Sequence, residues 1–293
     1  VGEVVNIAGR IMMKREICKL TFCHLQDESG RMQVAFKQDE VGADSYKLFV
    51  KKIDIADIIS VTGERFITHK GEESILAKEW TLLSKALLPL PDKFHGLQDE
   101  ELRLRKRYLD LLLNPELREV FRRKAKFWSS IRNFLVKESF LEVETPVLET
   151  TVGGADATPF MSHHNALDID VFLRISMGEL WQKRLMVAGF EKTFEIGRQF
   201  RNEGMSREHL QDYTQMEFYW AYANYEQGMA LVEKMYKDIL KETFNTLKFD
   251  IGEFKNIDIG KKWKKIDYTQ VIKEKTGINI LEATEEKIKN KLN

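Results

Sequence analysis

The chain has 293 residues, more than one domain usually holds, so two domains are expected. Its 46 Lys and Arg residues balance 46 Asp and Glu residues, which excludes a uniformly basic nucleic-acid-binding domain but not a local basic patch. A hydrophobic content of 43% excludes a disordered chain, and no apolar run approaches the ~18–20 residues of a membrane span.

The first part of the chain, residues 1–88, has the pattern of a small β-barrel. Hydrophobic residues alternate at Val5, Ile7 and Ile11, and four further strand-like runs follow with polar turns between them. These runs are Leu20–Asp27, Arg31–Phe36, Ile58–Thr68 and Ser74–Leu83. A short helix is expected over Ser45–Val50, between the third and fourth strands. This is the order of an OB-fold, which commonly binds oligonucleotides, although an SH3-like barrel or a five-stranded sandwich fits the same pattern.

A turn over Asp27–Gly30 sets the register of the second and third strands. With this turn, one face of the strand pair is apolar, and we expect that face to be the core. Its paired residues are Leu25 with Met32 and Cys23 with Val34. The opposite face carries Phe22, His24, Gln33 and Ala35.

Phe22 is therefore an aromatic ring on the side away from the predicted core, with Gln33 diagonally near it. An exposed ring offers a stacking platform for an unpaired base, and a neighbouring amide can hydrogen-bond the base edge. Arg15, in the preceding loop, is suited to hold a phosphate or a base. The alternative is that another part of the barrel covers Phe22.

The two cysteines, Cys18 and Cys23, lie on one strand-like run and would point to opposite faces, so no disulfide is expected. A chain without disulfides fits a reducing compartment. Because no signal-peptide pattern opens the chain either, we expect a cytoplasmic location and no membrane partner.

Residues 89–113 are expected to form a linker, because Pro89 and Pro91 at its start forbid a helix or a central strand. Asn114 followed by Pro115 predicts a helix start, with a capping side chain and a proline in the first turn. Hydrophobic residues keep helical spacing to about Lys137. Helix and strand signals then mix, so an α+β domain is expected over residues 114–293.

Two strand-like runs of this second domain, Lys192–Glu203 and Tyr213–Tyr222, each have one apolar and one polar face. The polar faces carry Glu195, Gly197, Arg201 and Glu203 on the first run and Tyr213, Gln215, Glu217 and Tyr219 on the second. A solvated strand pair shows the same alternation. It has no need, however, of Arg201 together with Glu203 and Glu217.

The second domain resembles the class II aminoacyl-tRNA synthetases at their motif 2, over Phe200-Arg201-Asn202-Glu203-Gly204, His209 and the following strand. Phe140–Pro146 is similar to motif 1, which ends in a proline at the dimer interface, here Pro146. Blocks that resemble the lysyl-tRNA synthetases are Pro89–Leu97, Arg107–Leu111, Gly153–Phe160 and His163–Asp168. The resemblance implies an N-terminal OB-fold for the anticodon, an antiparallel-sheet catalytic domain and a homodimer.

That family joins L-lysine to ATP as lysyl-adenylate and then passes the lysyl group to the 3′ end of tRNA(Lys). The lysine carboxylate is the nucleophile, so the protein has to position groups and stabilise charge at phosphorus. The resemblance implies ATP contacts at four positions. These are Arg201 on the α-phosphate, Glu203 on the adenine amino group, His209 near the distal phosphates and Tyr213 stacked on adenine.

Further matches imply the amino-acid and anticodon contacts. Glu217 and Tyr219 match residues around the lysine side chain, and an ammonium taken from water requires a carboxylate partner. Glu179 matches the carboxylate for the α-amino group, and Gly154 a backbone contact to the amino acid. The implied anticodon contacts are Arg15, Phe22, Gln33 and Glu72.

The chain departs from the family pattern in three places. The loop Ser206–Asp212 replaces the commoner Thr-Arg-His-Asn-Pro-Glu form, and Met177-Gly178-Glu179-Leu180-Trp181 replaces Ala-Pro-Glu-Leu-Tyr. Nothing after Gly252 resembles motif 3, the region expected to hold the Mg²⁺ ligands and a second carboxylate at the lysine ammonium. We therefore expect this chain to be an incomplete piece of the enzyme, with the Mg²⁺ ligands beyond residue 293; a degenerate relative is the alternative.

Two other functions remain open from the sequence. A sister enzyme that charges aspartate or asparagine would want cationic groups facing the substrate side chain, rather than Glu217. A non-enzymatic RNA-binding relative would keep the first domain and lose the chemistry of the second.

Overall fold

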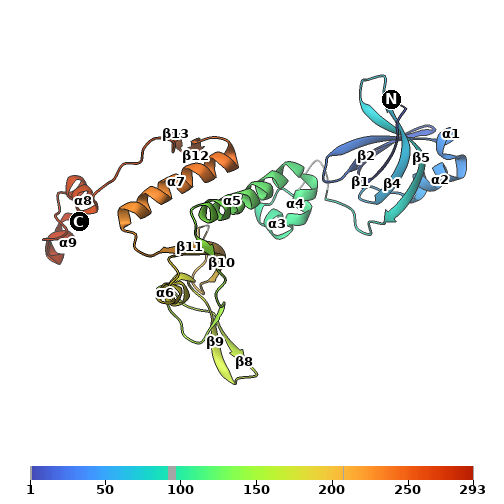
Figure 1. Ribbon diagram of the computed structural model, residues 1–293. Helices are drawn as coiled ribbons and strands as arrows, with labels where there is room; N and C mark the ends of the chain where they lie inside the picture. Colours follow the sequence, from blue (N-terminus) through green and yellow to red (C-terminus); the bar gives the residue numbers. More distant parts are fainter. Residues whose placement is uncertain (1, 92–96, 207, 293) are drawn as a thin grey trace. The chain divides into compact units, whose positions relative to one another are not determined.

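The computed structural model describes residues 2–91, 97–206 and 208–292, and the chain divides into two compact units, Val1–Arg118 and Glu119–Asn293 (Figure 1). Residues 92–96 of the lysyl-like block Pro89–Leu97, and Arg207 of the loop Ser206–Asp212, lie outside the described residues. Among the helices of the described part, none has both the length and the apolar character that crossing a membrane requires.

Five strands of the first unit close into a barrel in the order β1-β2-β3-β5-β4. The strands are β1 (Val4–Ile17), β2 (Leu20–Gln26), β3 (Arg31–Lys37), β4 (Ile58–Ile67) and β5 (Glu73–Ser84). The helices α1 (Gln38–Val41) and α2 (Ala43–Lys52) lie between β3 and β4. This element order confirms the predicted OB-fold.

The core of the barrel lies on the predicted face of β2 and β3. Leu25 pairs with Met32 and Cys23 with Val34, as the turn predicts. Cys23 and Val34 are fully buried, and Phe36 stacks on Phe49 of α2 with 3.9 Å between ring centroids. The two cysteines are free: Cys18 is exposed and Cys23 is buried.

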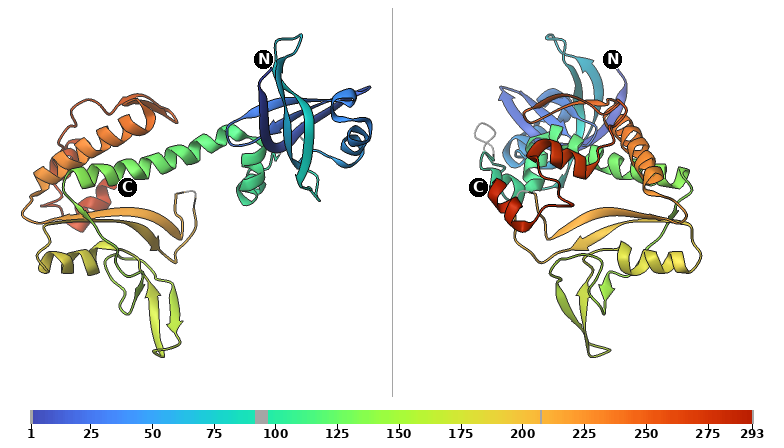
Figure 2. Two further views of the ribbon diagram at one scale, coloured as in Figure 1. Left: turned by 45° about the vertical axis from the view of Figure 1, so that its right-hand side comes forward. Right: turned by 90° about the vertical axis from the view of Figure 1, so that its left-hand side faces the viewer.

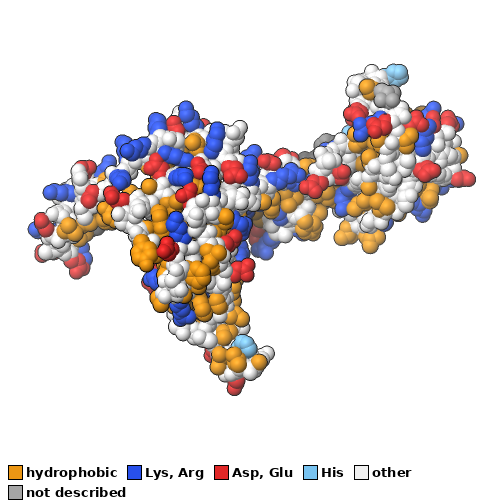
Figure 3. Space-filling view, in the orientation of Figure 1, with side chains coloured by type: hydrophobic (Ala, Val, Ile, Leu, Met, Phe, Trp, Pro, Cys, Tyr) orange, Lys and Arg blue, Asp and Glu red, His pale blue; other side chains and the backbone are white. Residues whose placement is uncertain are grey.

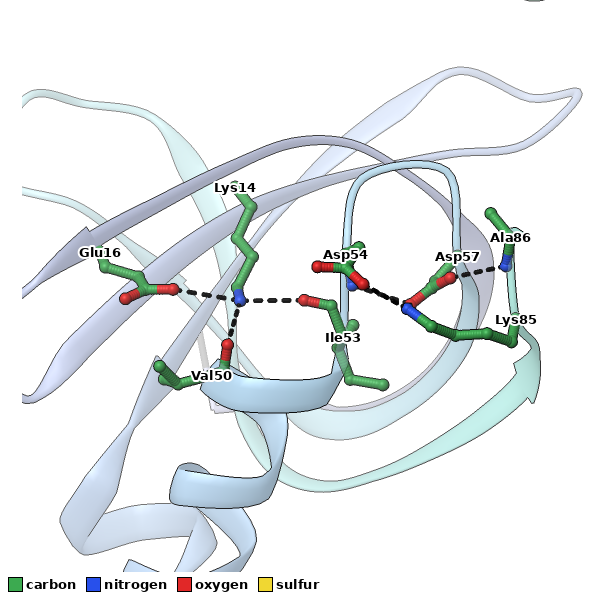
Figure 4. A network of polar contacts seen from close by, with 8 residues as sticks. All are labelled: Lys14, Glu16, Val50, Ile53, Asp54, Asp57, Lys85 and Ala86. Atoms are coloured by element: carbon green, nitrogen blue, oxygen red, sulfur yellow. Dashed lines mark hydrogen bonds and ion pairs between the residues drawn. The ribbon is translucent and has the colours of Figure 1, made fainter. Parts of the chain in front are cut away.

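A polar network fixes the loop between α2 and β4 to the end of β5 (Figure 4). Asp57 is fully buried and accepts hydrogen bonds from the N–H groups of Asp54 and Ala86, at 2.8 and 2.7 Å, and from Lys85 Nζ at 2.8 Å. Burial alone would raise the pKa of Asp57. The hydrogen bonds outweigh that cost, and the pKa lies below its ordinary value.

Lys14 stabilises the C-terminal end of α2 from the neighbouring strand β1 (Figure 4). Its Nζ donates to the carbonyl oxygens of Val50 and Ile53, at 2.8 and 2.9 Å, and lies 3.1 Å from Glu16. These carbonyls have no partner within the helix, so a cation at this end satisfies them and complements the helix dipole.

Short helices α3 (Glu100–Arg105), α4 (Arg107–Leu113) and the 3₁₀ turn η1 (Pro115–Leu117) follow the barrel in the first unit. They gather around the buried carboxylate of Asp110, which pairs with Arg103 at 3.1 Å and Arg107 at 2.8 Å. The predicted cap at Asn114 is wrong. Its side chain donates instead to Asp110 Oδ1 at 2.9 Å, because that charged acceptor lies one helical turn before it.

The second unit is built around a three-stranded sheet of order β11-β10-β6. Strand β10 (Lys192–Phe200) pairs antiparallel with β11 (Asp212–Trp220) and parallel with the short β6 (Leu141–Glu142). A second sheet has the order β7-β9-β8, from Leu148–Glu149, Ile169–Leu173 and Met161–His164. The remaining elements are α5 (Arg118–Lys137), α6 (Lys183–Val187), α7 (Tyr225–Phe244), β12 (Lys248–Ile251), β13 (Phe254–Asp258), α8 (Tyr268–Thr276) and α9 (Glu285–Leu292).

Helices α5 and α7 cover one face of the β10–β11 pair, and α6 lies on the other side (Figure 2). The covered face is the predicted apolar one, with Phe194, Ile196, Met216, Phe218 and Trp220 packed against both helices. The helices α5 and α7 do not cover the polar face of the strand pair, and the segment that leads into α6 lies against it. Lys and Arg side chains are interspersed with Asp and Glu side chains where α7, β12 and β13 lie, in keeping with a chain of zero formal charge (Figure 3).

Candidate functional site

The residues predicted for the polar face of β10 and β11 lie on one side of this strand pair, where residues of the two strands are directly opposite each other. Glu195 lies opposite Glu217, Gly197 opposite Gln215, and Gln199 opposite Tyr213. Residues 174–179 follow strand β9 and lead into the short π-helical turn η2 (Gly178–Gln182), and they cross this face. Carboxylates on β10 and β11 are thus partly covered rather than fully solvated.

Glu217 lies at the centre of this covered region. Its carboxylate accepts from Ser176 Oγ at 3.3 Å and from Gln215 Nε2 at 2.5 Å. A Cβ at Gly178 would lie 1.9 Å from Glu217 Oε2, so only glycine allows this approach to the backbone. Burial raises the pKa of Glu217 above its ordinary value, and the negative charges of Glu179 and Glu195 add to the rise.

Tyr219, Glu179 and Gly154 adjoin Glu217, so the four predicted lysine contacts are brought together. Burial, with the charges of Glu179 and Glu217, raises the pKa of Tyr219 to about 12, and its hydroxyl hydrogen-bonds Glu179. Gly154 has a φ of +87°, and a Cβ there would lie 2.8 Å from Glu179 Cβ and 3.0 Å from Ser176 Cβ. Glycine is needed here for both the backbone conformation and the close packing.

The four predicted ATP contacts line one pocket of about 270 Å³ at the open end of the same strand pair. Its predicted members are Arg201, Glu203, His209 and Tyr213. The Arg201 guanidinium lies 5.8 Å from the ring centroid of Tyr213, and its Nε donates to the carbonyl oxygen of Ile175 at 3.4 Å. Because Ile175 and Ser176 are consecutive, Arg201 and Glu217 contact the same segment of chain and share one face of the sheet.

Glu203 and His209 are the exposed members of this pocket. Glu203 Oε1 accepts from the N–H of Thr158 at 3.3 Å, and His209 Nδ1 lies 2.7 Å from Ser206 Oγ. Both side chains therefore keep free hydrogen-bonding atoms on an accessible surface, as contacts to a nucleotide would require.

A buried ion pair next to the polar face was not predicted from the sequence. Arg174 and Glu195 form a buried ion pair, with 2.6 Å between Nη1 and Oε1. Glu195 had been assigned to the polar face by alternation, whereas Arg174 was not singled out. An arginine within the apolar run Val171–Ile175 was the available signal, because a charge buried in such a run requires a partner.

The predicted anticodon residues converge on one face of the barrel. Arg15 does not lie in a loop, as predicted, but on β1, because β1 extends to Ile17. It pairs with Phe22 on β2, whose ring is only half-buried, so part of the ring stays accessible. Gln33 Nε2 donates to Ser74 Oγ at 2.8 Å. One carboxylate oxygen of Glu72 is 3.3 Å from Nε2 of His24, the neighbour of Phe22 and Gln33 on this face, so Glu72 lies beside these residues.

Pro146, the residue expected at a dimer interface, is exposed on the second unit. In the described part of the chain, no three side chains of the His, Cys, Asp or Glu type gather closely enough to hold a metal ion. We therefore assign no Mg²⁺ ligand among the described residues.

Two family models match the chain. Residues 99–292 match the model described as tRNA synthetases class II (D, K and N), and residues 5–83 match the OB-fold nucleic acid binding domain of the anticodon type. The first match covers more than half of the chain.

Curated relatives named lysine–tRNA ligase are similar over nearly the whole chain. The protein of Carboxydothermus hydrogenoformans is 47% identical over 95% of this chain and 57% of its own length. Those of Pelotomaculum thermopropionicum and Bacillus subtilis are each 46% identical, over 97% and 95% of this chain and 56% and 55% of their own lengths. The chain thus spans somewhat more than half the length of these relatives.

Proposed function

Because this chain belongs to the class II tRNA synthetases of the aspartate, lysine and asparagine group, we propose that it activates L-lysine with ATP and charges tRNA(Lys). The observation that carries the proposal is the pair of carboxylates, Glu217 on β11 and Glu179 on the turn η2 that crosses it, beside the pocket that Arg201 lines. A site with this charge suits an amino acid that has two ammonium groups.

We assign Glu217 and Tyr219 to the lysine side chain. Glu217 carries an ionised carboxylate only at an electrostatic cost, because it is partly buried near two other carboxylates. An incoming ammonium removes that cost and gains a charge-assisted hydrogen bond. Glu179 then receives the α-amino group, and Gly154 gives the amino acid a backbone contact. An aspartate side chain would meet like charge at the same place.

The assignment of the nucleotide follows the pocket beside this site. Tyr213 stacks on adenine and Glu203 accepts from its amino group, while His209 contacts the distal phosphates. In the chemical step, a carboxylate oxygen of lysine forms a bond to the α-phosphorus, and the bond from that phosphorus to pyrophosphate breaks. Arg201 stabilises the charge that develops on the α-phosphate, for which a permanently charged planar donor is suited. Mg²⁺ neutralises phosphate charge in this class of reaction, and no residue described here is assigned to it.

The barrel is assigned to the anticodon. Phe22 stacks on a base, while Gln33, Arg15 and Glu72 contact base edges or phosphate. Residues 1–88 form the anticodon-binding domain in this proposal, residues 89–113 the linker, and residues 114–293 contribute motifs 1 and 2 of the catalytic domain. We further propose a cytoplasmic homodimer with Pro146 at its interface.

The test is amino-acid-dependent exchange of pyrophosphate into ATP by the full-length protein, with lysine, aspartate and asparagine offered separately. Lysine alone is expected to support exchange, and a Glu217→Gln variant is expected to lose it. Exchange with aspartate or asparagine but not lysine would assign the protein to a sister enzyme. No exchange with any of the three, together with retained tRNA binding, would favour a non-enzymatic RNA-binding role.

A further inference from the structure

Arg174 and Glu195 form a buried ion pair next to the carboxylates of the polar face, and the proposed function assigns neither residue a substrate contact. Only 3% of the Arg174 side chain and 4% of the Glu195 side chain are exposed, and Nη1 and Oε1 are 2.6 Å apart. Burying two charges is costly, and replacing such a pair by apolar residues often stabilises a protein. Stability alone therefore does not explain why this ion pair lies here.

Arg174 joins two segments that are distant in sequence. Nη1 donates to the carbonyl oxygen and to Oγ1 of Thr145, at 3.2 and 3.1 Å, and Nε donates to the carbonyl oxygen of Arg198 at 3.0 Å. Thr145 Oγ1 in turn donates to Glu195 Oε2 at 2.6 Å. One guanidinium thus ties the end of the motif 1 region to strand β10.

The backbone of Arg174 is held by the same two segments. Its N–H donates to the carbonyl oxygen of Val147, and its own carbonyl oxygen accepts from the N–H of Phe200, at 2.9 and 3.0 Å. A Cβ at Gly197 would lie 2.2 Å from Arg174 Nη2, so glycine on β10 leaves room for the guanidinium. The next residues along the chain, 175–179, are those that contact Arg201 and Glu217.

The pair also sets the charge of the region. Glu195 lies directly opposite Glu217 on the antiparallel strands, where Cβ atoms are about 4.5–5.5 Å apart. Arg174 neutralises Glu195, and Lys183 makes an exposed ion pair with Glu179, so Glu217 is left as the net negative charge of these five groups. That single charge matches the side-chain ammonium of lysine, which Glu217 is assigned to bind.

We infer that Arg174 and Glu195 are positioning residues of the lysine site, which hold residues 175–179 across the sheet and fix the charge that Glu217 experiences. This inference rests on the proposed function, because it concerns the amino acid that the site binds. In this inference, Arg174 and Glu195 affect lysine binding through Glu217 and do not contact the substrate themselves.

The first measurement needs no substrate. The pKa of the Glu217 carboxyl is followed by NMR in ¹³C-glutamate-labelled chain, with Glu217→Gln used to assign its signal. Arg174→Gln removes the neutralising cation and is expected to raise that pKa, whereas Glu195→Gln removes a like charge and is expected to lower it, each by about one pH unit. The double variant Arg174→Gln/Glu195→Gln is expected to return it close to the wild-type value. Opposite directions for the two single variants distinguish charge coupling from loosened packing.

The second measurement is lysine affinity by calorimetry. Glu195→Gln leaves Arg174 unneutralised beside an ammonium and is expected to weaken binding about tenfold or more, while the double variant recovers most of the loss. Arg174→Gln leaves a buried carboxylate unpaired and can unfold the chain. The lysine affinity of Glu195→Gln is therefore compared with that of the double variant. Arg132→Gln is the matched control, since it breaks an exposed pair with Glu142 on the same unit.

Two results would overturn the inference. One is a Glu217 pKa that stays at the wild-type value in Glu195→Gln, where charge coupling predicts a lower value. The other is a lysine affinity that falls equally in Glu195→Gln and in the double variant, which would make the pair a structural clamp alone. If the wild-type chain binds no lysine while the carboxyl titration follows the expected pattern, the proposed function fails for this chain and the charge coupling stands.

Discussion

Gly178 lets two side chains of the polar face approach the backbone more closely than any other residue would allow. A Cβ there would lie 1.9 Å from Glu217 Oε2 and 2.8 Å from Tyr219 Cε2. These atoms lie at the ends of the Glu217 and Tyr219 side chains. A substitution at Gly178 would therefore push the two side chains away from the backbone and would not break the strand. Position 178 therefore controls how deep the carboxylate of the site lies.

Gly178→Ala is accordingly expected to move Glu217 and to lower kcat/KM for lysine about 10–100-fold, the size of effect that small misplacements of binding groups produce. Pyrophosphate exchange over a range of lysine concentrations measures this. Gly228→Ala on α7 is the control, because nothing lies within 4 Å of its Cβ and alanine favours a helix. Equal kinetics in the two variants would show that the approach at Gly178 is unimportant.

Glu217→Gln separates stability from binding. A carboxyl whose folded-state pKa is raised stabilises the fold below its unfolded-state pKa, and this contribution is lost as the pH rises through the folded-state value. The ionised form at pH 7 is thus the less stable one. Gln is expected to raise the Tm at pH 7, to leave it unchanged near pH 4, and to weaken lysine binding by about 1.5–3 kcal/mol. A Tm that falls at pH 7 would mean that the ionised carboxylate stabilises the fold.

At the scale of elements, Asp57 connects the loop after α2 to the end of β5 through three hydrogen bonds to a fully buried carboxylate. Asp57→Ala leaves two backbone N–H groups without this acceptor and is expected to cost about 1–3 kcal/mol of unfolding free energy. Because the pKa of Asp57 is lowered in the fold, its contribution is present above the unfolded-state pKa and is lost as the pH falls through the folded-state pKa.

Urea unfolding of Asp57→Ala at neutral and acidic pH tests this expectation. Asp54→Ala is the matched control, because Asp54 also pairs with Lys85 but its side chain is 71% exposed, and such pairs contribute about 0–1 kcal/mol. A loss of stability that is equal for the two variants, or that persists unchanged in acid, would rule out a special contribution of the buried carboxylate.

The strand faces of both units and the hairpin register of β2 and β3 were predictable, because side chains alternate with a period of two and a turn fixes which residues pair. The pairs Leu25–Met32 and Cys23–Val34 and the polar face with Glu217 follow from that local rule. The ion pair of Arg174 and Glu195 does not, since Arg174 directly follows β9 of one sheet, Glu195 lies on β10 of another, and only packing brings them together. The cap at Asn114 failed for a similar reason, because the competing carboxylate of Asp110 becomes available only once α4 has formed.

At the scale of the whole molecule, the two units carry different parts of the proposed function. The barrel has its own closed sheet and core, and the second unit has a separate core between β10–β11 and the helices α5 and α7. Each site lies on one unit only: Phe22 and Gln33 on the barrel, Arg201 and Glu217 on the second sheet. Anticodon binding and amino-acid activation are therefore expected to respond to different substitutions.

In the full-length protein, Arg201→Ala is expected to slow adenylate formation by about 10²–10³-fold, the effect of removing one donor at a developing charge, and to leave tRNA binding nearly unchanged. Phe22→Ala is expected to do the reverse: it weakens tRNA binding by about 1–3 kcal/mol, the value of one stacked base, and spares lysine-dependent pyrophosphate exchange. Phe22→Tyr keeps the ring and should restore affinity. If Phe22→Ala bound tRNA as tightly as the wild type, the half-buried ring would be a packing residue of the barrel. If instead it slowed exchange as much as Arg201→Ala, the sites would be energetically coupled, because a lost base contact on the barrel would have altered a pocket built entirely from the second unit.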